Sequence, residues 1–341
     1  MAYDSGQSTE TVIRVGGSAF LGSSPAFRNT VRSIERIAAY DATALVQGET
    51  GTGKELAARA LHYLSSRRNY PFVPVNCGAI PEALFESEFF GHVKGAFTDA
   101  KDTKPGLVQL AAGGTLFLDE IESLSPKGQV ALLRFLQDRS YRPVGGKTSF
   151  ADVRIISASN RDLNELVRLA EFRQDLFYRL ALLTLTLPPL RERIGDPALL
   201  AQHFIAVGSK RFGVPAKALH LSTLEWLGRY QWPGNVRELE NLMYREILMC
   251  ETAEIRIDTG QTRAATSDRR KRTDRRQPQW RSMAYQHAKS VVLQDFEQQY
   301  LVYLLEQTAG NVSAAAKLAG KERRCFGKLL KKNGIDKFRF V

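Results

Sequence analysis

The spacing of apolar positions changes several times along the chain, and each change predicts a different kind of element. Between residues 20 and 190, five short apolar runs recur without alternation: Thr43–Gln47, Phe72–Asn76, Thr115–Leu118, Val153–Ser157 and Leu182–Leu187. Continuous runs are typical of strands that are buried on both faces, as in a parallel sheet. Stretches of helical periodicity separate them, so residues 20–190 are predicted to form a layered α/β domain.

The remaining segments carry no strand signal. They are predicted to be a flexible tail, a small all-helical subdomain, a polar linker and a C-terminal helical domain, at residues 1–19, 191–258, 259–282 and 283–341. In the last of these, Val292, Phe296, Tyr300 and Leu304 share one helical face. Three helices are predicted there, at Glu297–Gln307, Asn311–Leu318 and Glu322–Lys332.

The charge is concentrated in two places. The chain has 48 Lys and Arg against 36 Asp and Glu, a net charge of +12. Residues 261–282 and residues 321–341 each contain eight basic and two acidic residues, which leaves the rest of the chain neutral. This distribution indicates a globular body with an attached nucleic-acid contact. The linker itself is expected to be a spacer extended by self-repulsion, with non-specific phosphate contact as a second role.

Two further observations exclude secreted and membrane classes. The first ten residues lack the basic and apolar regions of a signal peptide, and the apolar run Leu180–Leu190 is too short to span a bilayer. Cys77, Cys250 and Cys325 lie far apart, without the spacing of a metal site. We therefore expect a reduced, cytoplasmic protein without membrane contact.

A glycine-rich loop follows the first predicted strand and precedes the helical stretch Glu55–Ser65. Its residues are Gly48, Glu49, Thr50, Gly51, Thr52, Gly53 and Lys54. In such a loop the backbone N–H groups wrap phosphates, the helix N-terminus favours negative charge, and the lysine reaches the β- and γ-phosphates. Glu55 stands where this motif usually carries Ser or Thr, so other groups must hold the Mg²⁺ ion.

Two acids end the third predicted strand, 65 residues after Lys54. Asp119 is predicted to bind Mg²⁺ directly or through water, and Glu120 to polarise the attacking water. Together with the glycine-rich loop, this pair predicts nucleoside triphosphate hydrolysis.

One further segment of the chain resembles the signature of a particular protein family. Gly95, Ala96, Phe97, Thr98, Asp99 and Ala100, with the flanks Glu86–His92 and Gly113–Leu124, resemble the GAFTGA signature of bacterial enhancer-binding proteins. These are AAA+ ATPases that activate sigma-54 RNA polymerase. The resemblance covers about residues 20–258 and resumes at the C-terminus. It implies an ATP- and Mg²⁺-dependent P-loop NTPase with a parallel sheet and a helical lid, in which a mobile loop presents Phe97 and Thr98 to the sigma factor.

Asp99 departs from the signature, which has a second glycine there. The sequence therefore leaves open a DNA-binding regulator, or a partner in a hetero-oligomer, with impaired sigma-54 engagement. A P-loop ATPase that remodels a protein other than sigma-54 is a further alternative. The GAFT segment and the C-terminal helices argue against it.

The resemblance assigns further roles by position. Asn76 resembles the polar switch residue that controls Glu120, Asn160 resembles sensor I, and Arg237 resembles sensor II on the lid. Arg173 and Arg179 match the arginine-finger region, and the sequence does not rank them. Fingers that act in trans imply a ring of copies of this chain, a hexamer by resemblance. Residues Tyr141–Ser149 are placed like the family's second mobile loop.

The C-terminal segment resembles a Fis-type helix-turn-helix domain. Ala316 and Gly320 have a spacing that lets two helices pack closely across a turn. The helix that follows carries the basic residues expected to contact enhancer DNA: Arg323, Arg324, Lys328, Lys331 and Lys332. About 20 residues precede the ATPase domain, where family members commonly carry a receiver or ligand-sensing domain. Control in trans, by a separate regulatory protein or by expression level, is therefore expected.

Overall fold

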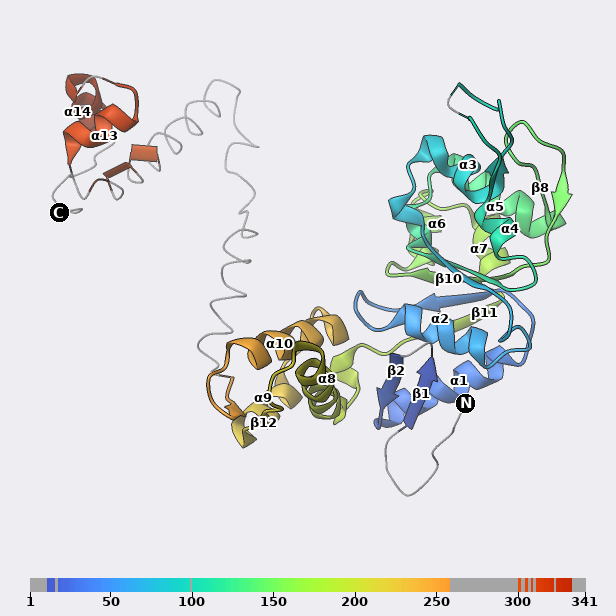
Figure 1. Ribbon diagram of the computed structural model, residues 1–341, viewed down its shortest axis with the longest axis horizontal. Helices are drawn as coiled ribbons and strands as arrows, with labels where there is room; N and C mark the ends of the chain where they lie inside the picture. Colours follow the sequence, from blue (N-terminus) through green and yellow to red (C-terminus); the bar gives the residue numbers. More distant parts are fainter. Residues whose placement is uncertain are drawn as a thin grey trace. The chain divides into compact units, whose positions relative to one another are not determined.

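The computed structural model describes residues 11–15, 18–98, 100–257, 300–301, 304–305, 308, 311–321 and 323–332 (Figure 1). The chain divides into two compact units, residues 1–258 and residues 259–341. Several positions singled out in the sequence lie outside the described residues, namely Asp99, Val292, Phe296 and the basic linker. The side chains of Lys331 and Lys332 also lie outside them.

Five parallel strands form the central sheet of the first unit, in the order β11-β3-β10-β7-β4. Their bounds are Ala44–Gln47 for β3, Phe72–Asn76 for β4, Thr115–Asp119 for β7, Arg154–Ser159 for β10 and Leu183–Thr186 for β11. Each overlaps one of the five apolar runs, so the predicted parallel sheet is confirmed. The carboxyl ends of these strands form one edge, where open α/β sheets bind their ligands.

Helices cover both faces of this sheet (Figure 1). On one face α1 (Pro25–Ala38) and α2 (Lys54–Tyr63) pack through residues such as Ile34 and Leu61 against β3, β10 and β11. The other face is covered by α5 (Pro126–Asp138), α6 (Leu163–Arg168) and α7 (Gln174–Leu180). Ser125 is the N-cap residue of α5, and its hydroxyl oxygen accepts a hydrogen bond from the Gly128 N–H. A proline follows in the first turn of the helix.

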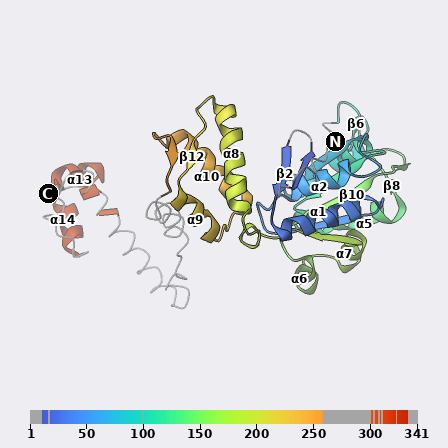
Figure 2. The same ribbon diagram turned by 90° about the horizontal axis from the view of Figure 1, so that it is seen from below.

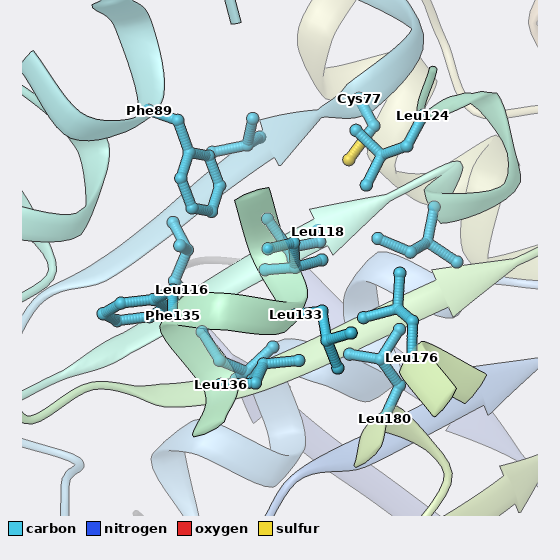
Figure 3. Packing of buried hydrophobic residues seen from close by; sticks show 14 of the residues in the cluster. Cys77, Phe89, Leu116, Leu118, Leu124, Leu133, Phe135, Leu136, Leu176 and Leu180 are labelled. Carbon is cyan, nitrogen blue, oxygen red and sulfur yellow. The ribbon is translucent and has the colours of Figure 1, made fainter. Parts of the chain in front are cut away.

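Helices α5 and α7 meet over strand β7, as Figure 3 shows from close by. The residues of this contact are Leu133 and Leu136 of α5, Leu176 and Leu180 of α7, and Leu116 and Leu118 of β7. This packing fixes α7 to the helix that follows the acidic end of β7.

Residues 11–15 and 18–22 form a pair of antiparallel strands, a β-hairpin that the sequence did not predict. Strand β1 (Thr11–Val15) pairs antiparallel with β2 (Ser18–Gly22), and Ile13 and Phe20 are buried. The expectation of a flexible tail over residues 1–19 is therefore wrong for residues 11–15 and 18–19. The hairpin lies between α2 and the first lid helix (Figure 2). Because α2 and the first lid helix are remote from the hairpin in the sequence, the five residues of each strand carried too little local signal to predict it.

The lid is built from α8 (Asp196–Phe212), α9 (Leu221–Arg229) and α10 (Asn235–Met249), packed around Trp232 and Leu239. This confirms the helical subdomain, with one correction. The two-residue strands β12 (Ala218–Leu219) and β13 (Glu254–Ile255) pair in parallel, and they are too short to show a periodicity. Shorter elements complete the unit: α3 (Phe85–Phe90), α4 (Leu107–Leu110), β5 (Gly91–His92), β6 (Lys104–Pro105), β8 (Ser140–Tyr141) and β9 (Ser149–Phe150). The described residues of this unit also form four 3₁₀ turns: η1 (Cys77–Ala79), η2 (Glu82–Leu84), η3 (Ile121–Ser123) and η4 (Leu190–Glu192).

The second unit contains the predicted pair of helices, α13 (Val312–Leu318) and α14 (Arg323–Lys332). Gly320, at φ +60°, forms the turn between them, and the Lys321 N–H donates to the Ala316 carbonyl at 2.9 Å. Phe326 packs with Leu304 and Leu305 in a small core. Of the residues predicted to share one helical face, Leu304 is buried and Tyr300 is 41% exposed.

Candidate functional site

The glycine-rich loop connects β3 to α2 at the carboxyl edge of the sheet. Gly51 and Gly53 adopt φ values of +82° and +96°, which favour glycine. The Lys54 ammonium donates to the Gly48 carbonyl at 2.8 Å and to the Glu49 carbonyl at 3.1 Å. Burial lowers the pKa of Lys54, and the nearby charges of Asp119 and Glu122 oppose that shift. The lysine therefore lies between the loop and the acidic end of β7.

The lid holds this loop from the other side. The Val236 N–H, at the start of α10, donates to the Gly51 carbonyl at 3.0 Å. The Asn235 amide donates to the Thr50 carbonyl at 3.0 Å and to the Glu49 carboxylate at 3.1 Å. Arg191 completes the contact with an ion pair to Glu49 at 2.6 Å. The hydrogen bonds from Arg191 and then Asn235 lower the pKa of Glu49.

These contacts place Arg237, the sensor II candidate, in the first turn of α10 beside the loop. Its own N–H donates to the Gly51 carbonyl at 3.4 Å. Asn235 and Arg191 were not predicted as site residues, because their partner Glu49 is remote in the sequence. Asn235 lies two residues before Arg237 at φ +52°, a conformation that asparagine tolerates better than most residues.

Asp119 is the last residue of strand β7, and Glu120 follows it directly. Burial raises the pKa of Asp119, and the charges of Glu120 and Glu122 add to the shift, while the Glu120 N–H at 3.0 Å and Lys54 oppose it. Glu120 has φ +52°, in the left-handed region. A non-glycine residue held there costs about 1–3 kcal/mol, and such strain is concentrated at functional sites.

A third carboxylate, Glu122, was not predicted as a site residue. Its Oε1 accepts the Asn160 N–H at 3.2 Å, so it holds the backbone of the sensor I candidate. Its Oε2 is buried and has no hydrogen-bond partner among the described residues. The only sequence signal was a second glutamate two positions after Glu120.

Together, the unpartnered Glu122 oxygen and the raised pKa of Asp119 fit a site for a divalent cation. Within the described part of the chain, no three His, Cys, Asp or Glu side chains form a complete metal site. A bound ion would therefore need further oxygen ligands, which water and the phosphates of a nucleotide can supply.

Asn76 lies beside Asp119 in the sheet register. Its Oδ1 accepts the Gly78 N–H at 2.8 Å and the Ala79 N–H at 3.2 Å, which caps the turn η1. A Cβ added to Gly78 would lie 3.0 Å from the Glu120 carboxylate and 3.3 Å from Asn76 Oδ1. The candidate switch and the candidate base are thus neighbours, although no hydrogen bond joins their side chains.

The two candidate fingers lie on α7 in different environments. The Arg173 guanidinium forms an ion pair with Asp175 at 2.7 Å. Arg179 is exposed, and its side chain has no hydrogen bond or ion pair to any described residue. Neither arginine forms a hydrogen bond or ion pair with the glycine-rich loop of its own chain. Glu55 pairs with Arg59 at 2.8 Å, so its carboxylate is engaged on the surface of α2.

The GAFT segment lies in the loop between β5 and β6. The Gly95 N–H donates to the Ala100 carbonyl at 2.8 Å, which closes the loop around Phe97. Phe97 is 42% exposed, and its ring centroid lies 4.9 Å from that of His92. The predicted second loop supports this one, because the Val93 N–H donates to the Val144 carbonyl at 3.1 Å. A Cβ on Gly145 would lie only 3.0 Å from the Ala96 Cβ.

An open cleft of about 880 Å³ lies next to Thr52 and Gly53, between the β1–β2 hairpin and the lid. Its apolar lining comes from both sides: Phe20, Leu21, Leu56, Leu200, Phe204 and Val236. Polar side chains, among them Arg193, His203 and Glu240, complete the lining, so a cleft beside a phosphate loop offers both apolar and polar contacts to the base of a nucleotide.

The recognition-helix candidates lie in the second unit. Arg323, Arg324 and Lys328 are exposed on α14. None of the described helices of either unit is long and apolar enough to cross a membrane.

Comparison with known proteins agrees with this geometry. Residues 20–186 match the Sigma-54 interaction domain, and residues 191–277 match the AAA+ ATPase lid domain. The transcriptional regulator NtrC of Azospirillum brasilense is 42% identical over 91% of this chain and 68% of its own length. The chain belongs to the sigma-54 interaction family of AAA+ ATPases.

Two further similarities support this assignment to the sigma-54 family. The response regulator PilR of Pseudomonas aeruginosa is 43% identical over 93% of this chain and 70% of its own length. The crystal structure of NtrX from Brucella abortus in complex with ATP shares 30% identity and a TM-score of 0.68, over 92% of this chain and 69% of that one. The predicted AAA+ fold is confirmed.

Proposed function

We propose that this chain binds enhancer DNA and uses ATP hydrolysis in a ring to convert the closed sigma-54 RNA polymerase complex into an open one. One observation carries the proposal. A single unit joins Lys54 and the acidic end of β7 to an exposed phenylalanine on a supported loop, within a chain of the sigma-54 family. Such an activity would place the protein in the bacterial cytoplasm.

In the nucleotide site, the backbone of residues 48–53 and the Lys54 ammonium would hold the phosphates of ATP. Glu120 would act as the base that orients and deprotonates the attacking water. Asn76, which neighbours Glu120, would govern its orientation, and Asn160 and Arg237 would respond to the γ-phosphate. Asp119 and Glu122 would hold Mg²⁺, which supplies charge neutralisation on the phosphates when it is bound.

The arginines of α7 would act on the nucleotide of a neighbouring protomer. Arg179 suits this role better than Arg173, because its side chain is exposed and is not paired with any described residue. A finger in trans is worth about 10³–10⁵ in turnover. It also requires a ring, for which we propose a hexamer.

The proposed domains follow from these roles. The ATPase subdomain would include the β1–β2 hairpin and end at residue 190, and the lid would follow over residues 191–258. Residues 259–282 would form a linker to a DNA-binding domain over residues 283–341. There, α14 would enter the major groove, with Arg323, Arg324 and Lys328 on bases or phosphates.

A second candidate function is favoured by one substitution. Asp99 places a negative charge in the loop that would contact the sigma factor. A chain whose loop engages poorly would act as a DNA-bound regulator, or as one partner in a hetero-oligomer, and would still hydrolyse ATP.

Promoter opening separates the two candidates. The intact chain and Glu120→Gln are compared for ATP hydrolysis and for open-complex formation on a sigma-54 promoter carrying an upstream binding site. The proposal predicts that the intact chain hydrolyses ATP and opens the promoter. Glu120→Gln, which removes the base, should neither hydrolyse ATP nor open the promoter. Hydrolysis by the intact chain without any promoter opening would favour the second candidate.

A further inference from the structure

A buried glutamine connects the acidic segment of the active site to the helix that carries the candidate fingers. Gln129 lies in the first turn of α5 and is only 2% exposed. Its amide nitrogen donates to the Leu124 carbonyl at 3.0 Å and to the Glu171 carbonyl at 3.2 Å. Its Oε1 accepts the Arg173 N–H at 2.9 Å.

This arrangement uses the full chemistry of a primary amide. Two carbonyl oxygens face the nitrogen and one backbone N–H faces the oxygen, so only one orientation of the amide satisfies all three partners. Glutamate has the same shape but no donor, and methionine has neither donor nor strong acceptor. No other residue type of this length would make the three bonds.

The partners belong to two functional segments. Leu124 closes the short stretch that begins with Asp119, Glu120 and the turn η3. Arg173 is the N-cap residue of α7, and its carbonyl accepts the Phe177 N–H at 3.1 Å in the first turn of that helix. Gln129 therefore sets where α7 begins, relative to the end of the acidic segment.

We propose that Gln129 is a positioning residue for the arginines of α7, and that it couples the nucleotide site of one protomer to the finger offered to the next. This rests on the proposed action of those arginines in trans. Leu124 follows the residues that serve the chain's own nucleotide, whereas α7 serves the neighbour's. A shift of the acidic segment would thus move the start of α7 through one amide.

The first test separates binding from turnover. Gln129→Met and Gln129→Glu should bind ATP with an affinity within about twofold of the intact chain while their turnover falls, because a misplacement of about 1 Å can cost 10²-fold. The matched control is Gln137→Met, an exposed glutamine on the same helix, which should leave both quantities unchanged. Thermal unfolding establishes that the variants are folded, and the glutamate variant keeps the shape of the side chain if methionine disrupts packing.

The decisive test mixes protomers. A Glu120→Gln protomer cannot hydrolyse ATP but presents intact arginines, whereas a Gln129 variant has an intact nucleotide site. If Gln129 acts through the finger, mixed rings regain hydrolysis that neither variant shows alone. If its role is confined to its own site, mixing restores nothing, and the inference is overturned.

A reference mixture distinguishes this failure from failure of the proposed function. In it, the Glu120→Gln protomer is combined with an Arg173→Ala/Arg179→Ala protomer. Recovery in the reference mixture but not with either Gln129 variant rejects only the coupling through Gln129. No recovery in the reference mixture rejects the finger in trans, and the inference with it.

Discussion

Asp119 lies in an environment that opposes its own charge. Burial and the neighbouring carboxylates of Glu120 and Glu122 raise its pKa above the ordinary value of 3.8. In the folded protein the ionised form is therefore disfavoured relative to the unfolded chain, and at neutral pH the difference appears as lost stability. Such a cost is typical of a residue kept for function rather than for folding.

Replacement of Asp119 by asparagine should therefore stabilise the nucleotide-free protein at pH 7. Asparagine keeps the acceptor for the Glu120 N–H and removes the charge. As the pH falls through the raised pKa of Asp119 toward 3.8, the carboxyl of the intact chain becomes protonated and the advantage of the variant should shrink. Urea unfolding between pH 7 and about pH 4.5 measures this. Asp102→Asn in an exposed loop serves as the control, and equal stabilities of Asp119→Asn and the intact chain at pH 7 would contradict the argument.

For single residues, the sequence singles out candidates that have a local signature and does not reveal those that have none. Lys54, Asp119 and Glu120 were predictable, because loop, strand and spacing fix their chemistry. Asn235 and Gln129 were not, because their partners lie 186 and 44 positions away. A buried amide in a helix has no periodic or compositional signal that separates it from a surface residue.

The glycine-rich loop and helix α10 lie so close together that Gly51 has no room for a side chain. A Cβ on Gly51 would lie 2.3 Å from the Gly234 carbonyl and 3.2 Å from the Arg237 Cβ. The contact holds Arg237, the sensor II candidate, against the loop, so the position of the lid and the conformation of the loop depend on each other.

Gly51→Ala should weaken both the fold and nucleotide binding. The left-handed conformation alone costs an alanine about 1–2 kcal/mol, and the clash displaces α10 from the loop. Gly228→Ala is the matched control, since that glycine is in helix α9 and an added Cβ meets nothing within 4 Å. This control should raise the free energy of unfolding by roughly 0.5–1 kcal/mol. Denaturant unfolding and equilibrium ATP binding test the pair, and normal ATP affinity in Gly51→Ala would contradict the coupling.

The elements themselves were largely predictable from apolar patterning. The five central strands overlap the predicted runs because burial on both faces demands continuous apolar residues. Strand β1 was missed because, beyond its pairing with β2, it packs against α2, which is remote in the sequence and leaves no trace in a local pattern. The strands β12 and β13 have two residues each, so the two-residue period of a strand never repeats in them.

In the whole molecule, nearly all of the excess positive charge belongs to the second unit and not to the unit that contains the nucleotide site. The basic residues of α14 belong to the second compact unit, so DNA binding and ATP hydrolysis are expected to respond differently to salt. Each phosphate contact contributes about 0.9 to the fall of log K per decade of salt.

Arg323→Ala/Arg324→Ala should therefore reduce the salt slope of DNA binding by up to about 1.8. Fluorescence anisotropy on a labelled duplex, measured over a range of salt concentrations, gives this slope. Lys210→Ala, an exposed lysine of the lid, should leave the slope unchanged. An unaltered slope in the double variant would show that α14 does not contact phosphates.

The most direct test of the central claim, that ATP hydrolysis is coupled to sigma-54 through Phe97, compares two exposed phenylalanines. ATP hydrolysis and open-complex formation on a sigma-54 promoter are measured together for Phe97→Ala and for Phe150→Ala, whose ring is 76% exposed outside the GAFT segment. The account predicts that Phe97→Ala hydrolyses ATP but does not open the promoter, whereas Phe150→Ala does both. Promoter opening by Phe97→Ala at the rate of the intact chain would contradict it.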